Sequence, residues 1–233
     1  MVPYFLRHYE TIADRIFVWD DDSDDGTAEI LKASKITEVL KKTVSGLDDA
    51  YFSELYSTAY RTLSRGVADW VIVAAADEFH VHKNLHALLA DTPKNSAYVL
   101  SRGWNMLAES APVTGGQIYD EVRKGVPDLM YNRIIFRPSS DVTVGIGCHG
   151  YTVDGQQIHR GDERYRSAPV NLLHMRYLGE DYIKARHGHI WQRLTEKNRE
   201  NGWGIHSSPE WTGKYSLGWF RETLPGAIEV PRD

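Results

Sequence analysis

The chain has 233 residues, of which 42% are hydrophobic and 25% are charged, a composition typical of a globular protein. Its formal net charge of -5 argues against nucleic-acid binding, which usually shows as a basic excess. The single cysteine, Cys148, excludes an intrachain disulfide and a cysteine-based metal site. No apolar run has the length of a membrane span and the N-terminus lacks a signal-peptide pattern. We therefore expect a cytoplasmic protein, which could act at the inner face of the membrane.

Helical and strand patterns alternate through the first hundred residues. The spacing of apolar residues predicts helices over 3–14, 28–33, 48–65 and 85–89. Runs of β-branched and aromatic residues predict strands over 15–19, 37–44, 70–74 and 97–101. The run over 70–74 is apolar throughout, as is typical of the middle of a parallel sheet. This alternation predicts an α/β fold with a doubly wound, mostly parallel (mixed) sheet flanked by helices.

The alternation weakens after Trp104. Residues 108–130 contain scattered Gly and Pro and are predicted to form a loop or lid. The polar residues 154–168 are predicted to be disordered or to cover a substrate. Two further strands and a C-terminal helix are predicted over 133–137, 142–146 and 180–200. We expect one domain over 1–179, with a helical, aromatic-rich extension over 180–233 packed on it.

An aspartate cluster directly follows the first predicted strand. Five aspartates occupy the six positions 20–25, and Gly26-Thr27 leads into the next helix. Carboxylates so close together repel one another, and they become useful when they hold a cation or grip a polar ligand. An EF-hand calcium loop matches the spacing over 21–26 but fails where its bidentate Glu is required, because that position is Lys32. A strand-to-helix turn rich in Asx residues explains one or two of the aspartates, but not five.

A second acidic motif follows the predicted strand over 70–74. Asp77 and Glu78 stand side by side at the end of an apolar run. Their carboxylates are therefore expected at the same sheet edge as the aspartate cluster, where ligands bind in open α/β sheets. The alternative is a pair of acids that caps a helix after a strand.

Together the two motifs resemble those of the family 2 glycosyltransferases, which have the GT-A fold. The signature Asp-Asp-x-Ser-x-Asp-Gly-Thr of that family is matched by Asp20, Asp21, Ser23, Asp25, Gly26 and Thr27. The family's Asp-x-Asp motif, in its Asp-Ala-Asp-Glu-Phe form, is matched by Asp77, Glu78 and Phe79, whereas Ala75 replaces its first Asp. The resemblance implies a GT-A-like sheet and a nucleotide-sugar loop formed by Asp20, Asp21, Ser23 and Asp25.

The resemblance also implies a reaction. An inverting enzyme of this kind transfers a hexosyl or related group from a nucleotide-diphosphate sugar to a saccharide, lipid-linked or protein acceptor. Asp77 would ligate Mn²⁺ or Mg²⁺, which neutralises the leaving diphosphate. His174 is expected to complete the metal shell, with His149 as the alternative, and a structural role is equally open for either histidine. Arg133, Arg176, Lys184 and Arg186 are candidate diphosphate contacts, since Arg and Lys pair with phosphate oxygens. Arg176 is the expected one, because it follows His174 by two residues, and surface charge is the ordinary explanation for the others.

An inverting transfer needs a carboxylate that takes the proton of the acceptor hydroxyl. The candidates after Trp104 are Glu109, Asp120, Glu121 and Asp128. We expect Glu109, because it is closest to Trp104-Asn105-Met106, which could form part of an acceptor pocket. A solvated loop acid is the alternative for each of them.

The chain opens with a predicted helix where a strand is expected from the resemblance, so we expect a start assigned too late or a shortened or minimal variant. Ala75 and this missing strand favour an alternative function, a binding or scaffold protein that has lost turnover. A metal-dependent phosphohydrolase is a third possibility, because paired Asp residues at strand ends serve that chemistry too. Its Asp-x-Asp-x-Thr nucleophile motif is not found.

Overall fold

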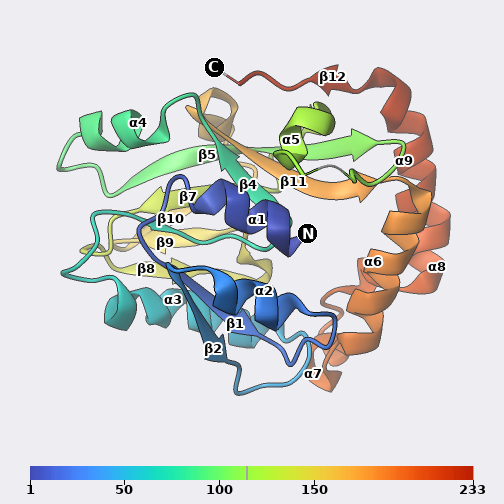
Figure 1. Ribbon diagram of the computed structural model, residues 1–233, viewed down its shortest axis with the longest axis horizontal. Coiled ribbons are helices and arrows are strands. Elements are labelled where there is room, and N and C mark those ends of the chain that lie inside the picture. Colours follow the sequence, from blue (N-terminus) through green and yellow to red (C-terminus); the bar gives the residue numbers. More distant parts are fainter. Residues whose placement is uncertain (114, 233) are drawn as a thin grey trace.

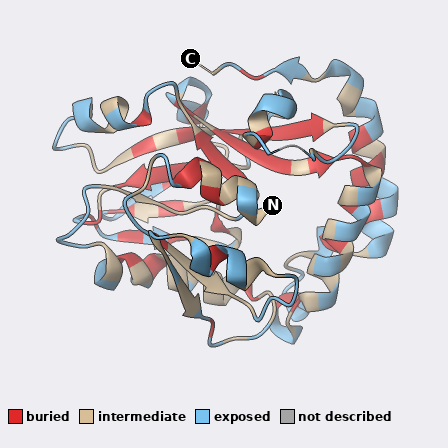
Figure 2. Ribbon diagram, in the orientation of Figure 1, coloured by how far each residue is buried: buried red, intermediate tan, exposed pale blue. Residues whose placement is uncertain are grey.

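The fold is described from a computed structural model, which covers residues 1–113 and 115–232. Its main sheet is strongly curled, like half of a barrel, and mostly antiparallel (Figure 1). The two longest strands, β5 (Tyr98–Ala108) and β11 (Val170–Leu178), run parallel through its centre. Both are largely buried, as Figure 2 shows, and they form the base on which the candidate site is built.

Short strands complete the main sheet on both sides of this central pair. One edge of β5 is shared by β7 along its first half and β6 along its second, and β4 lies beside β11. β3 extends the sheet from β7, and β12 extends it from β6. The bounds of these strands are β3 Val71–Ile72, β4 Glu78–Val81, β6 Lys124–Pro127, β7 Arg133–Phe136 and β12 Ile228–Glu229.

The predicted doubly wound, mostly parallel sheet of GT-A type is therefore wrong. In the described part of the main sheet, only β5 and β11 pair in parallel. The run expected in the middle of a parallel sheet forms only the two-residue β3, which is half-buried and antiparallel to β7. An apolar run indicates that a segment is buried, but it does not indicate whether the strand is parallel or antiparallel to its neighbours. That direction depends on partner strands that lie far away along the chain.

A separate two-stranded parallel sheet carries the aspartate cluster. Its strands, β1 (Ile16–Asp20) and β2 (Thr37–Lys41), are joined by α2 (Thr27–Ala33), since parallel strands need a crossover connection. Helix α1 (Val2–Tyr9) packs against this unit through a shared apolar cluster, which also includes Ile72 of β3. The predicted order helix, strand, helix, strand is thus confirmed for the first part of the chain.

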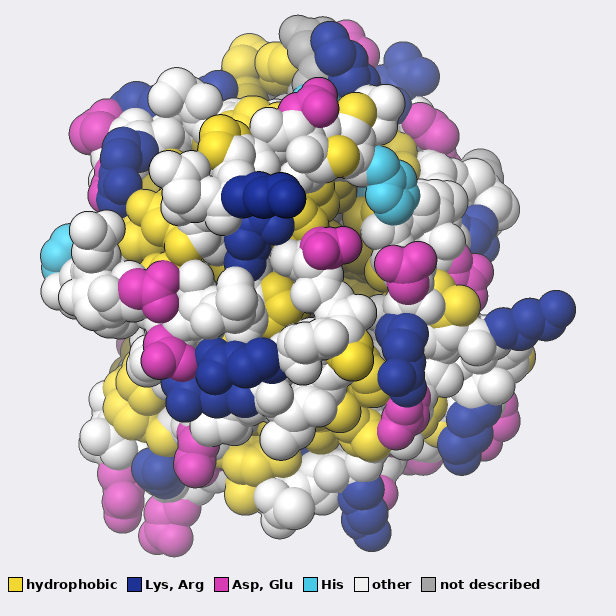
Figure 3. All heavy atoms as spheres, turned by 90° about the vertical axis from the view of Figure 1, so that its left-hand side faces the viewer, with side chains coloured by type: hydrophobic (Ala, Val, Ile, Leu, Met, Phe, Trp, Pro, Cys, Tyr) yellow, Lys and Arg dark blue, Asp and Glu magenta, His cyan; other side chains and the backbone are white. Residues whose placement is uncertain are grey.

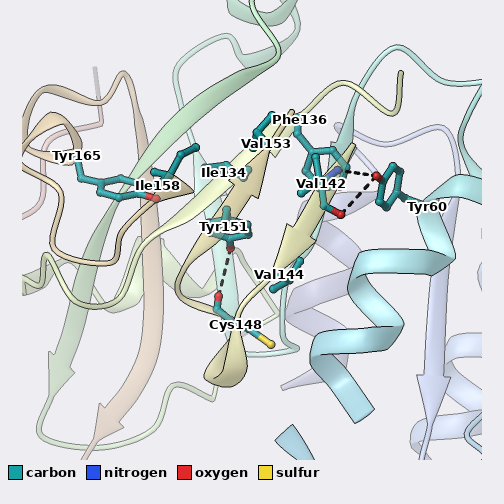
Figure 4. Packing of buried hydrophobic residues seen from close by; sticks show 10 residues of the cluster. All are labelled: Tyr60, Ile134, Phe136, Val142, Val144, Cys148, Tyr151, Val153, Ile158 and Tyr165. Carbon is teal, nitrogen blue, oxygen red and sulfur yellow. Dashed lines mark hydrogen bonds between the residues drawn. The ribbon is translucent and has the colours of Figure 1, made fainter. Parts of the chain in front are cut away.

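A third sheet consists of β8 (Val142–Val144), β9 (Tyr151–Val153) and β10 (Gln156–Ile158), and α3 (Asp49–Leu63) packs on it. Figure 4 shows the core between them, where the backbone N–H of Val142 donates to the Tyr60 hydroxyl over 2.7 Å. Ile158 and Tyr165 are buried in the same core. The expectation of disorder over 154–168 is therefore wrong, because these two large side chains anchor a segment that is polar elsewhere.

The C-terminal helices lie beyond the ends of β5 and β11, on the right of Figure 1. Ile183, Leu217 and Phe220 of these helices pack on Leu107 and Tyr177 of the sheet. The helix predicted over 180–200 is two helices, because its residues 194 and 195 are extended. The elements are α6 Glu180–Arg193, α7 Glu196–Glu200, α8 Pro209–Trp211, a π-helical turn Thr212–Ser216 and α9 Leu217–Thr223.

Smaller elements connect these layers. The predicted helix over 85–89 is confirmed as α4, and the predicted loop over 108–130 contains both α5 and β6. The bounds are α4 Leu85–Asp91 and α5 Ile118–Glu121, with 3₁₀ turns at Ile146–Cys148, Glu163–Ser167, Ile205–Ser207 and Leu224–Gly226.

Two surface properties bear on the partners of the protein. Over residues 1–113 and 115–232, no helix combines the length and the apolar character that crossing a bilayer requires. On the face shown in Figure 3, basic and acidic side chains are interspersed.

Two buried imidazoles should make the fold sensitive to mild acid. Burial lowers the pKa of His8 to about 4 and that of His80 to about 3. The unfolded chain, with histidine pKa values of about 6.5, therefore binds protons first as the pH falls. The contribution of these two neutral imidazoles to the free energy of unfolding is fully present above about pH 6.5 and is lost as the pH falls towards their pKa values in the folded state. We expect the urea midpoint to decrease across this range.

A variant separates this effect from general acid denaturation. His80→Gln removes one buried imidazole, so its urea midpoint should depend less on pH than that of the wild type. His86 is exposed, so His86→Gln should keep the wild-type pH dependence. A wild-type midpoint that stays constant between about pH 6.5 and pH 4 would contradict the expectation.

Candidate functional site

The aspartate cluster forms the turn from β1 into α2. Ser23 donates to Asp20 from its backbone N–H over 3.2 Å and from its hydroxyl over 2.6 Å. The backbone N–H of Thr27 donates to Asp25 over 3.1 Å, and hydrogen bonds from Thr27 lower the pKa of the Asp25 carboxyl. An Asx-rich turn thus explains Asp20, Ser23 and Asp25, three of the four residues assigned to the nucleotide-sugar loop.

Asp21, the fourth residue, is paired with two cations. Lys42 Nζ lies 3.1 Å from its Oδ2, and Arg193 of α6 contacts the same oxygen. The lysine is almost completely buried, and burial lowers the pKa of its ammonium group. Buried charges need a partner of opposite charge. Through Lys42, which directly follows β2, and Arg193 of α6, Asp21 therefore connects the aspartate cluster to these two elements.

Asp77 lies between β3 and β4, in contact with a second arginine of α6. Its Oδ2 accepts hydrogen bonds from Arg186 Nε and Nη2, at 3.0 and 2.7 Å, and lies 3.4 Å from Nε2 of His174. Burial alone would raise the pKa of Asp77, but Arg186 and His174 outweigh it and hold the pKa well below its usual range. Burial also lowers the pKa of His174, which favours the neutral imidazole.

The ring of Tyr131 contacts both candidate histidine ligands. It stacks on His174, with ring centroids 3.8 Å apart and an interplanar angle of 8°, and lies 4.2 Å from the His149 ring. Burial lowers the pKa of His149 to about 3. Nδ1 of each imidazole is buried without a hydrogen-bond partner in the described chain. His174 is the histidine that faces Asp77.

Glu78 has a structural role that the sequence did not reveal. Its carboxylate is fully buried and accepts hydrogen bonds from Arg133 Nε and Nη2, at 3.1 and 2.8 Å, and from the Tyr131 hydroxyl. The backbone N–H of Ala75 is a further donor, at 2.8 Å. Glu78 begins β4, so the alternative of a helix-capping acid pair is wrong. No motif of the sequence indicated Arg133 as its partner.

Helix α6 brings the two acidic motifs together. Arg186 and Arg193 are seven residues apart, a spacing that places them on one helix face, and they contact Asp77 and Asp21 respectively. The Met1 amino group lies near both motifs: burial lowers its pKa, while Asp25 and Asp77 raise it. We call this group, Asp21, Asp77, His174, Arg186 and Arg193, the acid–arginine site. The spacing of the two arginines was the signal that sequence reasoning missed.

Two predicted residues lie elsewhere. Arg176, on β11, lines a cleft formed with the C-terminal helices. Glu109 directly follows β5 and is exposed. Neither residue is among the described contacts of Asp77 or Asp21. The diphosphate role of Arg176 and the base role of Glu109 remain predictions.

The predicted Mn²⁺ or Mg²⁺ does not fit the residues as they are arranged. In the described part of the chain, no group of three or more His, Cys, Asp or Glu side chains is placed to hold a metal ion. Asp77 and His174 offer two donors, but Arg186 already bonds the carboxylate oxygen that faces His174. A metal at this point would have to displace a guanidinium group.

Comparison of the chain with family models, with curated proteins and with solved structures finds no match.

Proposed function

We propose that the chain is a glycosyltransferase that uses a nucleotide-diphosphate sugar as donor. The observation that carries this proposal is the convergence of the two acidic motifs on the two arginines of α6. Carboxylates bind the hydroxyl groups of a ribose or a sugar, and guanidinium groups bind diphosphate oxygens in a bidentate manner. A nucleotide sugar carries both kinds of group within one molecule.

The arginines would exchange partners when the donor binds. Without a ligand, Arg186 neutralises Asp77 and Arg193 neutralises Asp21. A diphosphate placed beside α6 offers both guanidinium groups a second anion. Fixed positive charge at this point would stabilise the negative charge that develops on the leaving diphosphate. Glu109 remains the predicted base for the acceptor hydroxyl.

A second candidate is a protein that binds a nucleotide sugar without turnover. The ion pair between Arg186 and Asp77, with an N···O distance of 2.7 Å, favours this candidate. It already neutralises Asp77, which is the predicted metal ligand. Ala75, at the place of a motif aspartate, agrees with this alternative. The two candidates share the binding site and differ only in chemistry.

Thermal unfolding with UDP and with GDP, each with and without Mn²⁺, tests the proposal. A ligand of the folded state at a hundredfold excess over its dissociation constant stabilises it by about 2.7 kcal/mol. We expect this stabilisation for one of the nucleotides, and its loss in Arg186→Met. Arg123 is an exposed arginine outside the site, so Arg123→Met should respond like the wild type.

Turnover then separates the candidates. Release of the nucleoside diphosphate from its sugar donor supports the glycosyltransferase, whereas binding without release supports the protein without turnover. Release of inorganic phosphate would instead favour the phosphohydrolase. If no nucleotide stabilises the protein, both nucleotide-sugar candidates are wrong. A requirement for Mn²⁺ would show that a metal does displace Arg186.

A further inference from the structure

A cleft of about 470 Å³ lies between the main sheet and the C-terminal helices, outside the acid–arginine site. Its volume is within the range of about 300 to 1,000 Å³ that small-molecule sites occupy. Four aromatic side chains contribute to its lining, namely Tyr177, Trp211, Tyr215 and Trp219. The cleft therefore offers several flat apolar surfaces to a ligand.

The aromatic rings are arranged in two pairs. Trp211 and Tyr215 have ring centroids 4.6 Å apart, and Tyr177 and Trp219 have theirs 4.5 Å apart. The first pair is open to solvent, with Trp211 40% and Tyr215 47% exposed. The π-helical turn Thr212–Ser216 presents Tyr215, and π-helical turns are frequent at functional sites. Two adjacent, partly exposed aromatic rings offer an apolar surface against which a flat face of a ligand can pack.

Two polar side chains in the lining of the cleft each have a buried atom without a hydrogen-bond partner in the described chain. Asn105 is 7% exposed and donates to Asp128 over 2.8 Å, while its Oδ1 is buried without a partner in the described chain. Nε of Arg176 is also buried without such a partner. Buried polar atoms are nearly always hydrogen-bonded, so a ligand or a water is expected to complete these groups.

The charges of the cleft narrow the class of ligand. An aromatic pocket with a carboxylate would suit a quaternary ammonium group, but the guanidinium of Arg176 in the same lining repels a cation. Asp128 likewise disfavours an anion. An uncharged molecule with apolar faces and many hydroxyl groups satisfies both the rings and the three polar side chains. We propose that this cleft binds a neutral saccharide.

Strand β11 connects the cleft with the acid–arginine site, because Arg176 lines the cleft and His174, two residues earlier on the same strand, lies beside Asp77. Burial raises the pKa of Tyr177, and the neighbouring charges that modify it are Arg176, Arg186 and Asp128. Tyr177 thus lies within the electrostatic reach of Arg186, which binds Asp77, and of two polar groups of the cleft. Use of the cleft as the acceptor subsite rests on the proposed glycosyltransferase function, whereas saccharide binding does not.

Isothermal titration without any nucleotide tests the inference. The probes are maltotriose, cellotriose and triacetylchitotriose, with choline and acetate as charged comparisons. We expect saturable binding of at least one trisaccharide and none of the charged molecules. Trp211→Ala and Tyr215→Ala, both at exposed rings, should each weaken binding by about tenfold. Asp128→Asn should weaken it as well. Trp191 does not line the cleft, so Trp191→Ala should bind like the wild type.

Three results would overturn the inference. They are no binding of any trisaccharide, trisaccharide binding that all three cleft variants leave unchanged, and binding of choline instead of a trisaccharide. Circular dichroism of each variant shows that it is folded, and two independent ring variants keep the test decisive if one of them is not. The saccharide titration contains no nucleotide, so its result is independent of the thermal unfolding test with UDP and GDP. Failure of one test therefore does not change the conclusion from the other.

Discussion

Gly103→Ala is expected to lower the free energy of unfolding by more than about 4 kcal/mol, which is exceptional for one methyl group. A Cβ atom at Gly103 would lie 1.7 Å from the carbonyl oxygen of Tyr131 and 2.7 Å from that of Asp128. Both atoms belong to the backbone, so no side-chain rotation relieves the clash. Two hydrogen bonds of 2.9 Å, which join Gly103 to Asn132 and to Asp128, also hold this segment against β5.

Urea unfolding of the variant measures this effect. Gly218 provides the matched control, because it lies in α9 and a Cβ atom there would meet nothing within 4 Å. Gly218→Ala should be neutral or stabilise the protein by about 0.5–1 kcal/mol, since alanine favours the helix. A Gly103→Ala protein with the wild-type midpoint would show that the segment 128–132 can move away from β5.

Arg133→Met is expected to destabilise the protein by about 3–5 kcal/mol. Glu78 is fully buried and the Arg133 side chain is 5% exposed, with an N···O distance of 2.8 Å. The variant retains the volume of the side chain but leaves a buried carboxylate without its counter-ion. For comparison, Arg15 and Glu38 form an exposed pair at 3.0 Å, so Arg15→Met should cost less than about 1 kcal/mol.

The pH dependence of Arg133→Met provides an independent check. Burial would raise the pKa of Glu78, but Arg133 outweighs it and lowers the pKa to about 2. The stability from this group is therefore present above about pH 4.5 and is lost as the pH falls towards 2. Without Arg133, burial dominates and protonation relieves the buried charge. The difference between wild type and variant should therefore begin to shrink above about pH 4.5, where the buried carboxyl of the variant takes up a proton, and should keep shrinking towards pH 2. A constant difference would contradict this account.

Local signals explain why the early elements could be predicted. The N-cap of α3 is Asp48, whose carboxylate accepts from the backbone N–H of Tyr51 over 2.9 Å, as a capping residue should. α2 likewise begins where Asp25 and Gly26 turn the chain. These features depend on residues that are near neighbours in the sequence, so a pattern can reveal them.

Of the two central strands of the main sheet, the first part of β5 was predicted over 97–101, whereas β11 could not be predicted in this way. β11 is buried on both faces and contains His174 within an apolar run, so it lacks the alternation that identifies a half-buried strand. β4 was hidden because Glu78 and His80 make the segment look polar, although both are buried. Their partners, Arg133 and Tyr9, lie far away along the chain. Tertiary contacts, not local preference, define these strands.

The candidate site shows the same division. The motifs indicated Asp21 and Asp77, and the structure places Nε2 of His174, which the resemblance had named, 3.4 Å from Asp77. Arg186 was one of the candidate diphosphate contacts, but its pairing with Asp77 and the role of Arg193 were not indicated, because these contacts depend on how α6 docks on two different sheets. A sequence pattern contains the spacing of the two arginines, but not the surface that they meet.

The short segment over 128–132, which passes between β6 and β7, belongs to two sites at once. Asp128, at its start, lines the cleft beside the C-terminal helices, and Tyr131, near its end, stacks on His174 beside Asp77. Gly103 leaves no room for the segment to shift independently of β5. An insertion or deletion here would remodel both sites in a single evolutionary event. The ligand preferences of the cleft and of the acid–arginine site are therefore expected to diverge jointly among descendants of this protein.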